Sequence, residues 1–504
     1  MSLRKSKSQS QIQKHGAVTM LNNDVIACAM EYLDLPELSR AMATCRALYD
    51  LGIPILLRDV QLVRSWRGHY QSRFALYRRH LLKNPARFAL IRSLSCPVAA
   101  LDDRIRTLFR ALPRNFTSIR SLEVDMNVTE VDGYLASWVL SLENLRSLKL
   151  VHTTEYSPAL MQLLQRMGSK LEELHIGTLP LIPTPTIFHP LQALAGSAHT
   201  LRSLSIQYYF QSGGPAIAPE DGLCFRAVEE LSWTSAQNIL VSDLVSTFPT
   251  LRKLCIKNPD FEFRYTVAPE DFDEDAFLQV RTYNRHVQNC SRMRWKLLER
   301  LEGDPITLWV LGLRCRVTQL RIGLDGIELS SKPGYTLAVL HDTWPEHLVL
   351  TASTRCSPAH LERILSFPSL RKLDLTFRLM ESGDCSAKVH ALLIEALQQM
   401  CGTNVRYLRI TVELWLEVFT KMRGGSEVKR PQPKRAFPAL WRAKVPQILE
   451  AFPALVELEI DIWKSHPFVW KRGHDEQRLD AKDSLDVYCR HEDPICPCAP
   501  SEES

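Results

Sequence analysis

The chain has 504 residues, 45% of them hydrophobic, and its 62 basic and 56 acidic side chains give a net charge of +6. This length exceeds one ordinary core unless the architecture is elongated. So small a charge excess gives no general signal for nucleic acid or for a membrane surface. No apolar run approaches the roughly 20 residues of a membrane-spanning helix. The N-terminus lacks a secretory signal, and the 13 cysteines are scattered singly, as reduced thiols are. We therefore expect a protein of the cytoplasm or nucleus that uses no cofactor.

A small helical module follows a basic tail, residues 1–20, which we expect to be disordered. Residues 21–60 predict three short helices, the first capped by Asn22 or Asn23, with a break before Pro36. About forty residues cannot build a good independent core. The helices show more apolar surface than they can bury together, so the module needs a partner, either the rest of the chain or another protein.

One phrase recurs after a predicted helical connector at residues 61–90. It reads apolar-x-x-Leu-x-apolar, and its Leu-x-apolar end predicts a short strand with two apolar side chains on one face. The copies are IRSLSC (91–96), IRSLEV (119–124), LRSLKL (145–150), LEELHI (171–176), LRSLSI (201–206), VEELSW (228–233), LRKLCI (251–256), VTQLRI (317–322), PEHLVL (345–350), LRKLDL (370–375), VRYLRI (405–410) and LVELEI (455–460).

Helical patterns lie between the copies, at 157–167, 357–365 and 387–400. The first two begin Ser-Pro, which is typical of a helix start. Strands lie about 4.8 Å apart whereas helices need about 8–10 Å, so stacked strand–helix units must curve. The sequence therefore predicts an α/β fold in which a curved parallel sheet is backed by helices.

The region 91–465 resembles an irregular leucine-rich-repeat solenoid. Successive copies in its first half start about 23–30 residues apart, within the range of that family. Most copies lack the Asn or Cys with which the family's phrase continues to support its turn. Inserts near 258–300, with a predicted helix around 284–301, and near 421–440 interrupt the repeats. An ordinary α/β domain with leucine-rich strands is the alternative.

The end of the chain, residues 466–504, is predicted to be a disordered tail. Its CRHEDPICPC segment (489–498) could in principle hold zinc, but the spacing matches no common zinc finger, so we expect no metal. The KRPQPKR segment (429–435) has the composition of a nuclear import signal, although a solvated basic loop is the simpler interpretation.

The N-terminal module resembles an F-box. The residues that carry the resemblance are Leu21, Val25, Ile26, Met30, YLDLPEL (32–38), Met42 and TCRALYDLGIPILLRDV (44–60). The last stretch is especially similar to the F-boxes of fungal proteins with such repeats. Asn22 departs from the pattern, because the family commonly has Pro there. The position directly before leucine-rich repeats strengthens the resemblance.

The resemblance implies a non-catalytic substrate-recognition subunit of a Skp–cullin–F-box ubiquitin ligase. The module would bind a Skp-type adaptor and through it a cullin, while the solenoid would bind a protein substrate. The adaptor-binding residues that it implies are Leu21, Val25, Ile26, Met30, Leu33, Leu35, Pro36, Leu38, Met42 and Cys45. The alternative is a leucine-rich interaction scaffold outside any ligase, whose N-terminal helices cap the first repeat. No catalytic motif supports an enzyme.

The substrate surface is expected at outward-facing positions of the strands. Charges of both signs are mixed there, so no single ligand class is indicated. The candidates are Glu123, Lys149, His175, Lys253, Lys257, Arg321, Lys372, Asp374, Tyr407, Arg409, Glu457, Glu459 and Asp461.

Overall fold

The computed structural model falls into two units, Met1–Asn127 with Ser137–Leu148 and Val128–Ala136 with Lys149–Ser504. None of the helices in the described part combines the length and the apolar character needed to cross a membrane. The described residues are 22–61, 81, 84–97, 116–125, 133–153, 158–167, 171–178, 190–207, 222–234, 239–257, 274–290, 294–324, 334–353, 358–379, 404–414, 448–450, 452–462 and 468–471.

The first unit begins with a module of three helices, α1 (Asn23–Glu31), α2 (Leu35–Thr44) and α3 (Arg46–Arg58). The Asn22 side chain caps α1, accepting a hydrogen bond from the Asp24 N–H at 3.1 Å. Gly52 allows α3 to approach the other two helices, because a Cβ there would lie 2.4 Å from Met42 Cγ. The buried apolar side chains of the three helices are Met30, Leu38, Met42, Ile53, Leu56 and Leu57.

The first strands follow this module directly. The unit continues with β1 (Asp59–Gln61), the 3-10 helix η1 (Pro85–Leu90), β2 (Ser93–Pro97) and β3 (Ser121–Asp125). β1 pairs in parallel with β2, and β2 with β3. Most of the predicted connector, residues 61–90, lies outside the described residues, as do residues 387–400 and 421–440.

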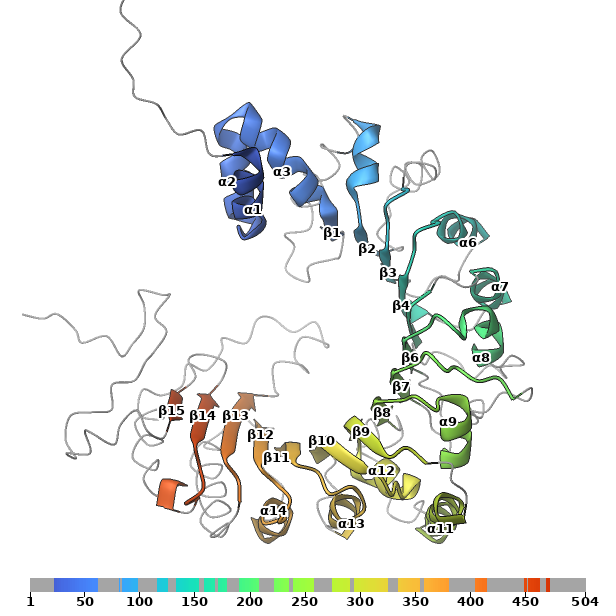
Figure 1. The fold of residues 1–504 in the computed structure, drawn as a ribbon, viewed down its shortest axis with the longest axis vertical. Helices are drawn as coiled ribbons and strands as arrows, with labels where there is room; N and C mark the ends of the chain where they lie inside the picture. The colour runs from blue at the N-terminus through green and yellow to red at the C-terminus, as the bar shows by residue number, and fades with distance from the viewer. Residues whose placement is uncertain are drawn as a thin grey trace, which may run out of the picture. The chain divides into compact units, whose positions relative to one another are not determined.

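Strand order follows chain order from β1 to β15. In the second unit, β5 to β14 pair in parallel with their chain neighbours, and the helices lie along one side of the curved sheet (Figure 1). The remaining elements are α6 (Gly133–Leu140), β4 (Ser147–Thr153), α7 (Pro158–Arg166), β5 (Glu173–Thr178), α8 (Pro190–Ala193), η4 (Ala195–Ser197), β6 (Ser203–Gln207), β7 (Glu230–Thr234), α9 (Val241–Thr247), β8 (Lys253–Lys257), α11 (Glu274–Cys290), β9 (Leu297–Gly303), α12 (Pro305–Leu311), β10 (Arg316–Leu324), α13 (Gly334–Thr343), β11 (His347–Ser353), α14 (Pro358–Leu365), β12 (Lys372–Leu379), β13 (Tyr407–Leu414), β14 (Glu457–Ile462) and β15 (Phe468–Lys471).

The predicted fold class is confirmed: three helices precede a curved parallel sheet backed by helices. Every copy of the repeated phrase forms a strand, and its two apolar residues are buried. In β6, for example, Leu204 and Ile206 are buried while Ser203, Ser205 and Gln207 alternate outward. The predicted helices at 157–167 and 357–365 are α7 and α14.

A phenylalanine three residues before the phrase marks the turn into several strands. Phe116, Phe225, Phe248, Phe367 and Phe452 are buried there. Close to it in the turn, a hydroxyl side chain donates to a carbonyl oxygen of the preceding repeat, as Thr250 does to Arg226 at 2.8 Å and Ser369 does to Pro345 at 2.6 Å. These aromatic and polar contacts support the turns for which the usual Asn or Cys is missing.

The first insert differs from its prediction at one end. α11 ends at Cys290, and the second part of the expected helix around 284–301 is instead the strand β9, which lies between β8 and β10. The repeat is hard to recognise in the sequence because Gly303 stands where the other copies have an apolar side chain. A Cβ at Gly303 would lie 2.4 Å from the Ile256 carbonyl oxygen, so the close approach of the two strands requires glycine.

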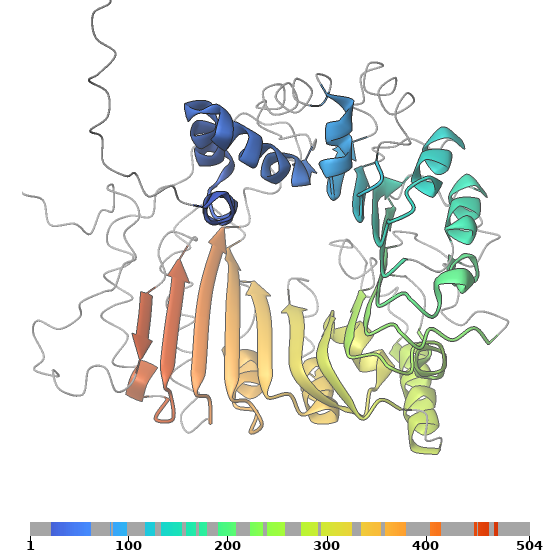
Figure 2. The ribbon, with the colours of Figure 1, turned by 45° about the horizontal axis from the view of Figure 1, so that its top comes forward.

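The second difference concerns the tail predicted from residue 466. Phe468–Lys471 forms β15, which pairs antiparallel with β14 (Figure 2). The physical reason lies in the sequence itself, since Phe-Val-Trp has high strand propensity. Residues 472–504, including the CRHEDPICPC segment, lie outside the described residues.

Candidate functional site

Apolar side chains remain exposed on α1 and in the turn that leads from α1 into α2. The exposed fractions are 52% for Val25, 91% for Tyr32, 36% for Leu33 and 37% for Leu35, and Pro36 is exposed as well. We call these five residues the apolar edge. The other comparably exposed large apolar side chains of the described chain all belong to the second unit. Because large apolar side chains are exposed here on one pair of adjoining helices, we take the apolar edge as a candidate interaction surface.

The two faces of α1 explain which side chains reach the apolar edge. Ile26 and Met30, four residues apart, turn toward α2 and α3, and Met30 is only 3% exposed. Val25, Cys28 and Tyr32, at spacings of three and four residues, lie on the other face and are all exposed. A helix of this length therefore has one face inside the module and one face left open.

A capping box holds the turn between the two helices. The Asp34 carboxylate accepts from the Glu37 N–H at 2.8 Å, and the Glu37 carboxylate accepts from the Asp34 N–H at 3.2 Å. This arrangement fixes the backbone on both sides of Asp34. Leu35 then precedes Leu38 and Met42 on one face of α2, so that Leu35 lies at the open end of the module's core.

The residues implied for adaptor binding fall into two groups. Met30, Leu38 and Met42 are buried and stabilise the module itself. The exposed members are Val25, Leu33, Leu35, Pro36 and Cys45; Ile26 is half-buried, and Leu21 lies outside the described residues.

Tyr32 is the most exposed large apolar residue of the described chain, yet it was not among the predicted contacts. The predicted contacts come mainly from the apolar band of the helix, and Tyr32 falls outside that band because it caps the C-terminus of α1. The signal that could have found it is its place at the start of YLDLPEL.

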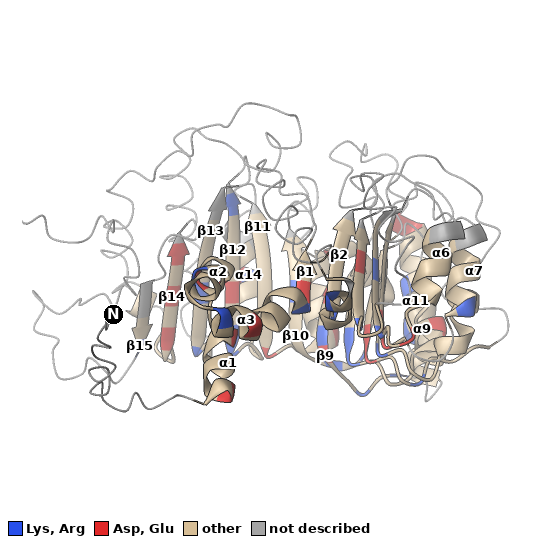
Figure 3. Cartoon of the chain, turned by 90° about the horizontal axis from the view of Figure 1, so that it is seen from above, with Lys and Arg blue, Asp and Glu red and all other residues tan. Residues whose placement is uncertain are grey.

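The predicted substrate positions all lie on strands, at positions that alternate with buried side chains. The best-connected group crosses β12, β13 and β14, where Asp374 is the register partner of Arg409, and Arg409 of Glu459. Lys372, Tyr407 and Glu457 form a second such row. Figure 3 shows acidic positions along β14. The remaining candidates are Glu123 on β3, Lys149 on β4, His175 on β5, Lys253 and Lys257 on β8, Arg321 on β10 and Asp461 on β14.

These charges are largely neutralised by their neighbours. Arg409 pairs with Glu459 at 3.3 Å, and Arg321 lies 3.8 Å from Glu302. Lys253 pairs with Glu230, and Glu457 with Lys471 at 3.5 Å. A face whose ion pairs are already made offers mixed polar contacts to a partner, without a strong field of either sign.

His347 and Asp374 form the most enclosed pair on this face. Their Nε2 and Oδ2 atoms are 2.8 Å apart, and the Gln319 amide nitrogen lies 3.1 Å from His347 Nδ1. Burial works to raise the pKa of the Asp374 carboxyl. The hydrogen bond and charge of His347, with the charges of Lys372 and Arg409, outweigh burial and hold that pKa below its ordinary value.

No grouping of His, Cys, Asp and Glu side chains able to hold a metal ion occurs among the described residues. The chain matches no family model, and no curated protein matches it either.

Proposed function

We propose that the protein is a non-catalytic substrate receptor of a Skp–cullin–F-box ubiquitin ligase. The observation that carries the proposal is the apolar edge, which exposes several of the residues that give the module its resemblance to an F-box. An adaptor that covers Val25, Tyr32 and Leu35 would remove apolar surface from water, which is the main driving force of such association.

The receptor would act as a bridge. The module holds the adaptor, the strands of the solenoid hold the target, and a target lysine is kept near the enzyme that carries ubiquitin. Tethering of this kind can raise the effective concentration to about the millimolar range. No residue of this chain performs chemistry in that scheme.

A scaffold outside any ligase is the second candidate, and one observation favours it. α3 runs directly into β1, the Arg92 N–H bonds to the Arg58 carbonyl at 2.9 Å, and the Arg87 guanidinium donates to the Tyr49 hydroxyl at 3.4 Å. The module is thus built to cover the start of the repeats. These contacts involve α3, however, and leave the apolar edge of α1 and α2 unused.

Titration of purified Skp-type adaptor into the full chain, followed by calorimetry, tests the proposal. We expect Val25→Glu to weaken binding at least about 30-fold, because it places a charge in an apolar interface. Its melting temperature should stay unchanged, since Val25 is exposed.

Val456→Glu is the matched control, because Val456 is also an exposed valine, at 40%, but lies in the second unit. It should bind the adaptor as the wild type does. If the adaptor does not bind the wild-type chain, or binds Val25→Glu equally well, the receptor proposal is wrong and the scaffold outside any ligase is the remaining candidate.

A further inference from the structure

Four arginines stand one above another in the first unit. Each occupies the residue just before a strand, and the backbone joins them in sequence: the Arg92 N–H bonds to the Arg58 carbonyl at 2.9 Å, Arg120 to Arg92 at 2.8 Å and Arg146 to Arg120 at 2.8 Å. All four are exposed. We call them the arginine ladder. Neighbouring strands lie about 4.8 Å apart, so adjacent rungs of like charge are close.

Part of the second unit fills the same position with alternating signs, although Arg371 and Arg406 are also consecutive there. Its backbone bonds join Glu172, Arg202, Glu229, Arg252 and Glu299 in that order. Arg252 lies 3.8 Å from Glu229 and also pairs with Glu299. Each arginine in that series therefore has a glutamate on the strand at either side. Arg92 and Arg120, at the centre of the arginine ladder, have arginines there instead.

The central rungs of the ladder hold the free charge. Arg58 pairs with Glu31 at 3.3 Å, and Arg146 has a polar contact of its own. Neither Arg92 nor Arg120 has a charged partner among the residues that the structure describes. Four consecutive arginines with two unneutralised guanidinium groups repel one another, and an external anion would relieve that repulsion.

An anion at the arginine ladder would be bound by side chains, because the backbone groups there are already hydrogen-bonded to the neighbouring repeats. The Arg92 and Arg120 carbonyls each accept from two N–H groups of the next repeat, as Arg92 does from Arg120 and Ser121 at 2.8 and 3.1 Å. Each of the last three arginines is followed by a half-exposed serine, Ser93, Ser121 or Ser147. Guanidinium forks beside hydroxyl donors are suited to phosphate and carboxylate oxygens.

We propose that the arginine ladder binds an acidic segment of a partner protein, through phosphate or carboxylate groups that lie across Arg92 and Arg120. An extended peptide places alternate side chains about 6.7 Å apart, within the span of flexible arginines on adjacent strands. A single-stranded nucleic acid is less well matched, because such sites also need aromatic platforms for the bases. The residues that follow the arginines are serines, which cannot stack on bases. Tyr32 is the one large aromatic side chain that is exposed in the described part of this unit.

The identification of this segment as part of a ubiquitylated target rests on the proposed function, whereas the binding itself does not. The test uses the full chain and fluorescein-labelled peptides with phosphoserine, glutamate or unmodified serine at every second position. Anisotropy should show binding that weakens as salt is raised, because the Debye length falls from about 10 Å at 0.1 M to about 3 Å at 1 M. Preference for the phosphoserine peptide assigns phosphate as the source of the oxyanions, and equal binding of the glutamate peptide assigns carboxylates.

The double variant Arg92→Gln with Arg120→Gln should bind at least about tenfold more weakly, because two charge-assisted contacts are lost. The matched control is Arg371→Gln with Arg406→Gln, which removes the same charge from the same repeat position in the second unit, where both arginines are exposed. The control should change affinity less than about threefold. Both double variants should melt as the wild type does.

Three results would overturn the inference: neither acidic peptide binds, both double variants weaken binding equally, or only a uridine oligonucleotide binds in a way that depends on Arg92 and Arg120. Adaptor titrations separate this inference from the proposed function. If Val25→Glu and the wild type both fail to bind adaptor while the acidic peptide still requires Arg92 and Arg120, the ligase assignment falls and the acidic-segment site stands.

Discussion

The Asp374 carboxylate shows how a single residue on the strand face can stabilise the fold. It accepts a hydrogen bond from His347 and lies beside Lys372 and Arg409. These contacts stabilise the ionised carboxylate by more than burial destabilises it. Because the pKa of Asp374 is lowered in the folded protein, folding gains stability from the carboxylate. That gain is complete above the ordinary Asp pKa of about 3.9 and is lost as the pH falls through the folded value.

Asp374→Asn should therefore lower the free energy of unfolding at pH 7 by about 1 kcal/mol, the usual worth of such a hydrogen-bonded contact. On going from pH 7 to pH 3, the variant should lose less stability than the wild type, because it has no carboxylate to protonate. Urea unfolding at both pH values measures this. Equal losses in the two proteins would show that the His347 contact contributes nothing to stability.

The burial of individual residues could be predicted where a pattern repeats, as in the Leu-x-apolar strands, and not where one residue breaks the pattern. Val25 and Leu35, the contacts that the F-box resemblance implies, are exposed, and their role in binding stays a prediction. Whether Met30 or Tyr32 faces outward depends on the angle at which α1 meets its neighbours, which no local pattern contains. The strand β9 was not predicted for a similar reason. Glycine is needed at Gly303 because the carbonyl oxygen of Ile256, in another repeat, lies close to it.

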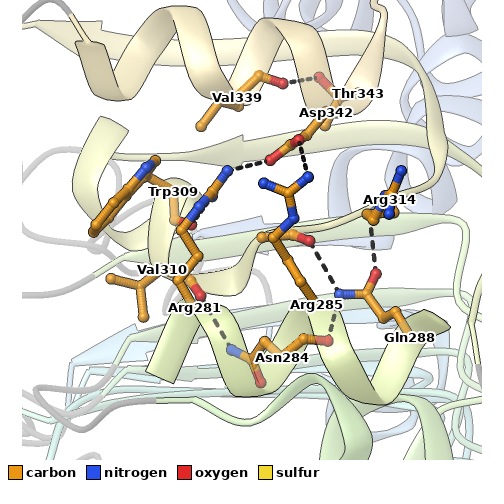
Figure 4. Close-up of polar contacts among 11 residues, drawn as sticks. Arg281, Asn284, Arg285, Gln288, Trp309, Val310, Arg314, Val339, Asp342 and Thr343 are labelled. Atoms are coloured by element: carbon orange, nitrogen blue, oxygen red, sulfur yellow. Dashed lines mark hydrogen bonds and ion pairs between the residues drawn. The ribbon is translucent and has the colours of Figure 1, made fainter. Parts of the chain in front are cut away.

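At the scale of elements, α11 contacts the neighbouring helices α9, α12 and α13 through buried polar side chains. Arg281, Asn284 and Gln288 form a buried stripe along it (Figure 4). Asn284 accepts from the Val241 N–H at 3.0 Å and donates to the Val310 carbonyl at 3.1 Å. The stripe thus supplies hydrogen-bond partners to the start of α9 and the end of α12.

The other two members of the stripe act on α12 and α13. Gln288 donates to the Gly312 carbonyl at 3.1 Å, and Arg281 pairs with Asp342 at 2.6 Å. Burial lowers the pKa of Arg281, and the Asp342 carboxylate opposes that shift. Helix ends that are buried without partners are costly, so α11 works as a shared cap for its neighbours.

Asn284→Ala should destabilise the second unit by about 2–4 kcal/mol, because it leaves buried backbone groups without partners. Asn289→Ala is the matched control on the same helix. Asn289 is exposed and its side-chain amide oxygen accepts from the Arg314 guanidinium at 2.8 Å, so its loss should cost under about 1 kcal/mol. Thermal unfolding of both variants gives the comparison. Similar costs for the two would mean that the buried stripe is not required.

The existence of the elements was predictable, because the Leu-x-apolar alternation fixes the strands and the Ser-Pro starts fix α7 and α14. The role of α11 was not, since its buried residues are Arg, Asn and Gln, which read as a solvated face. The phenylalanine of the turns is a further signal in the sequence, since Phe-Pro-x directly precedes LRKL at both Phe248 and Phe367.

At the scale of the whole molecule, the chain separates its two kinds of surface by unit. The apolar edge and the arginine ladder belong to the first unit, and the mixed-charge face of β12 to β14 belongs to the second. A bridging protein needs distinct surfaces for distinct partners. The fold class could be predicted because twelve copies of one phrase agree with one another. The binding partner of a surface could not, because the residues of a surface do not recur as a pattern in the sequence.

The central claim is that an adaptor covers the apolar edge, and cysteine footprinting tests it most directly. Cys28 lies on α1 between Val25 and Tyr32, Cys45 follows α2, and Cys290 ends α11 in the second unit; all three are exposed. The measurement is the alkylation rate of each thiol, followed by mass spectrometry with and without saturating Skp-type adaptor. The account predicts that Cys28 and Cys45 become several-fold slower while Cys290 is unchanged. A bound adaptor that leaves Cys28 as reactive as before would contradict it.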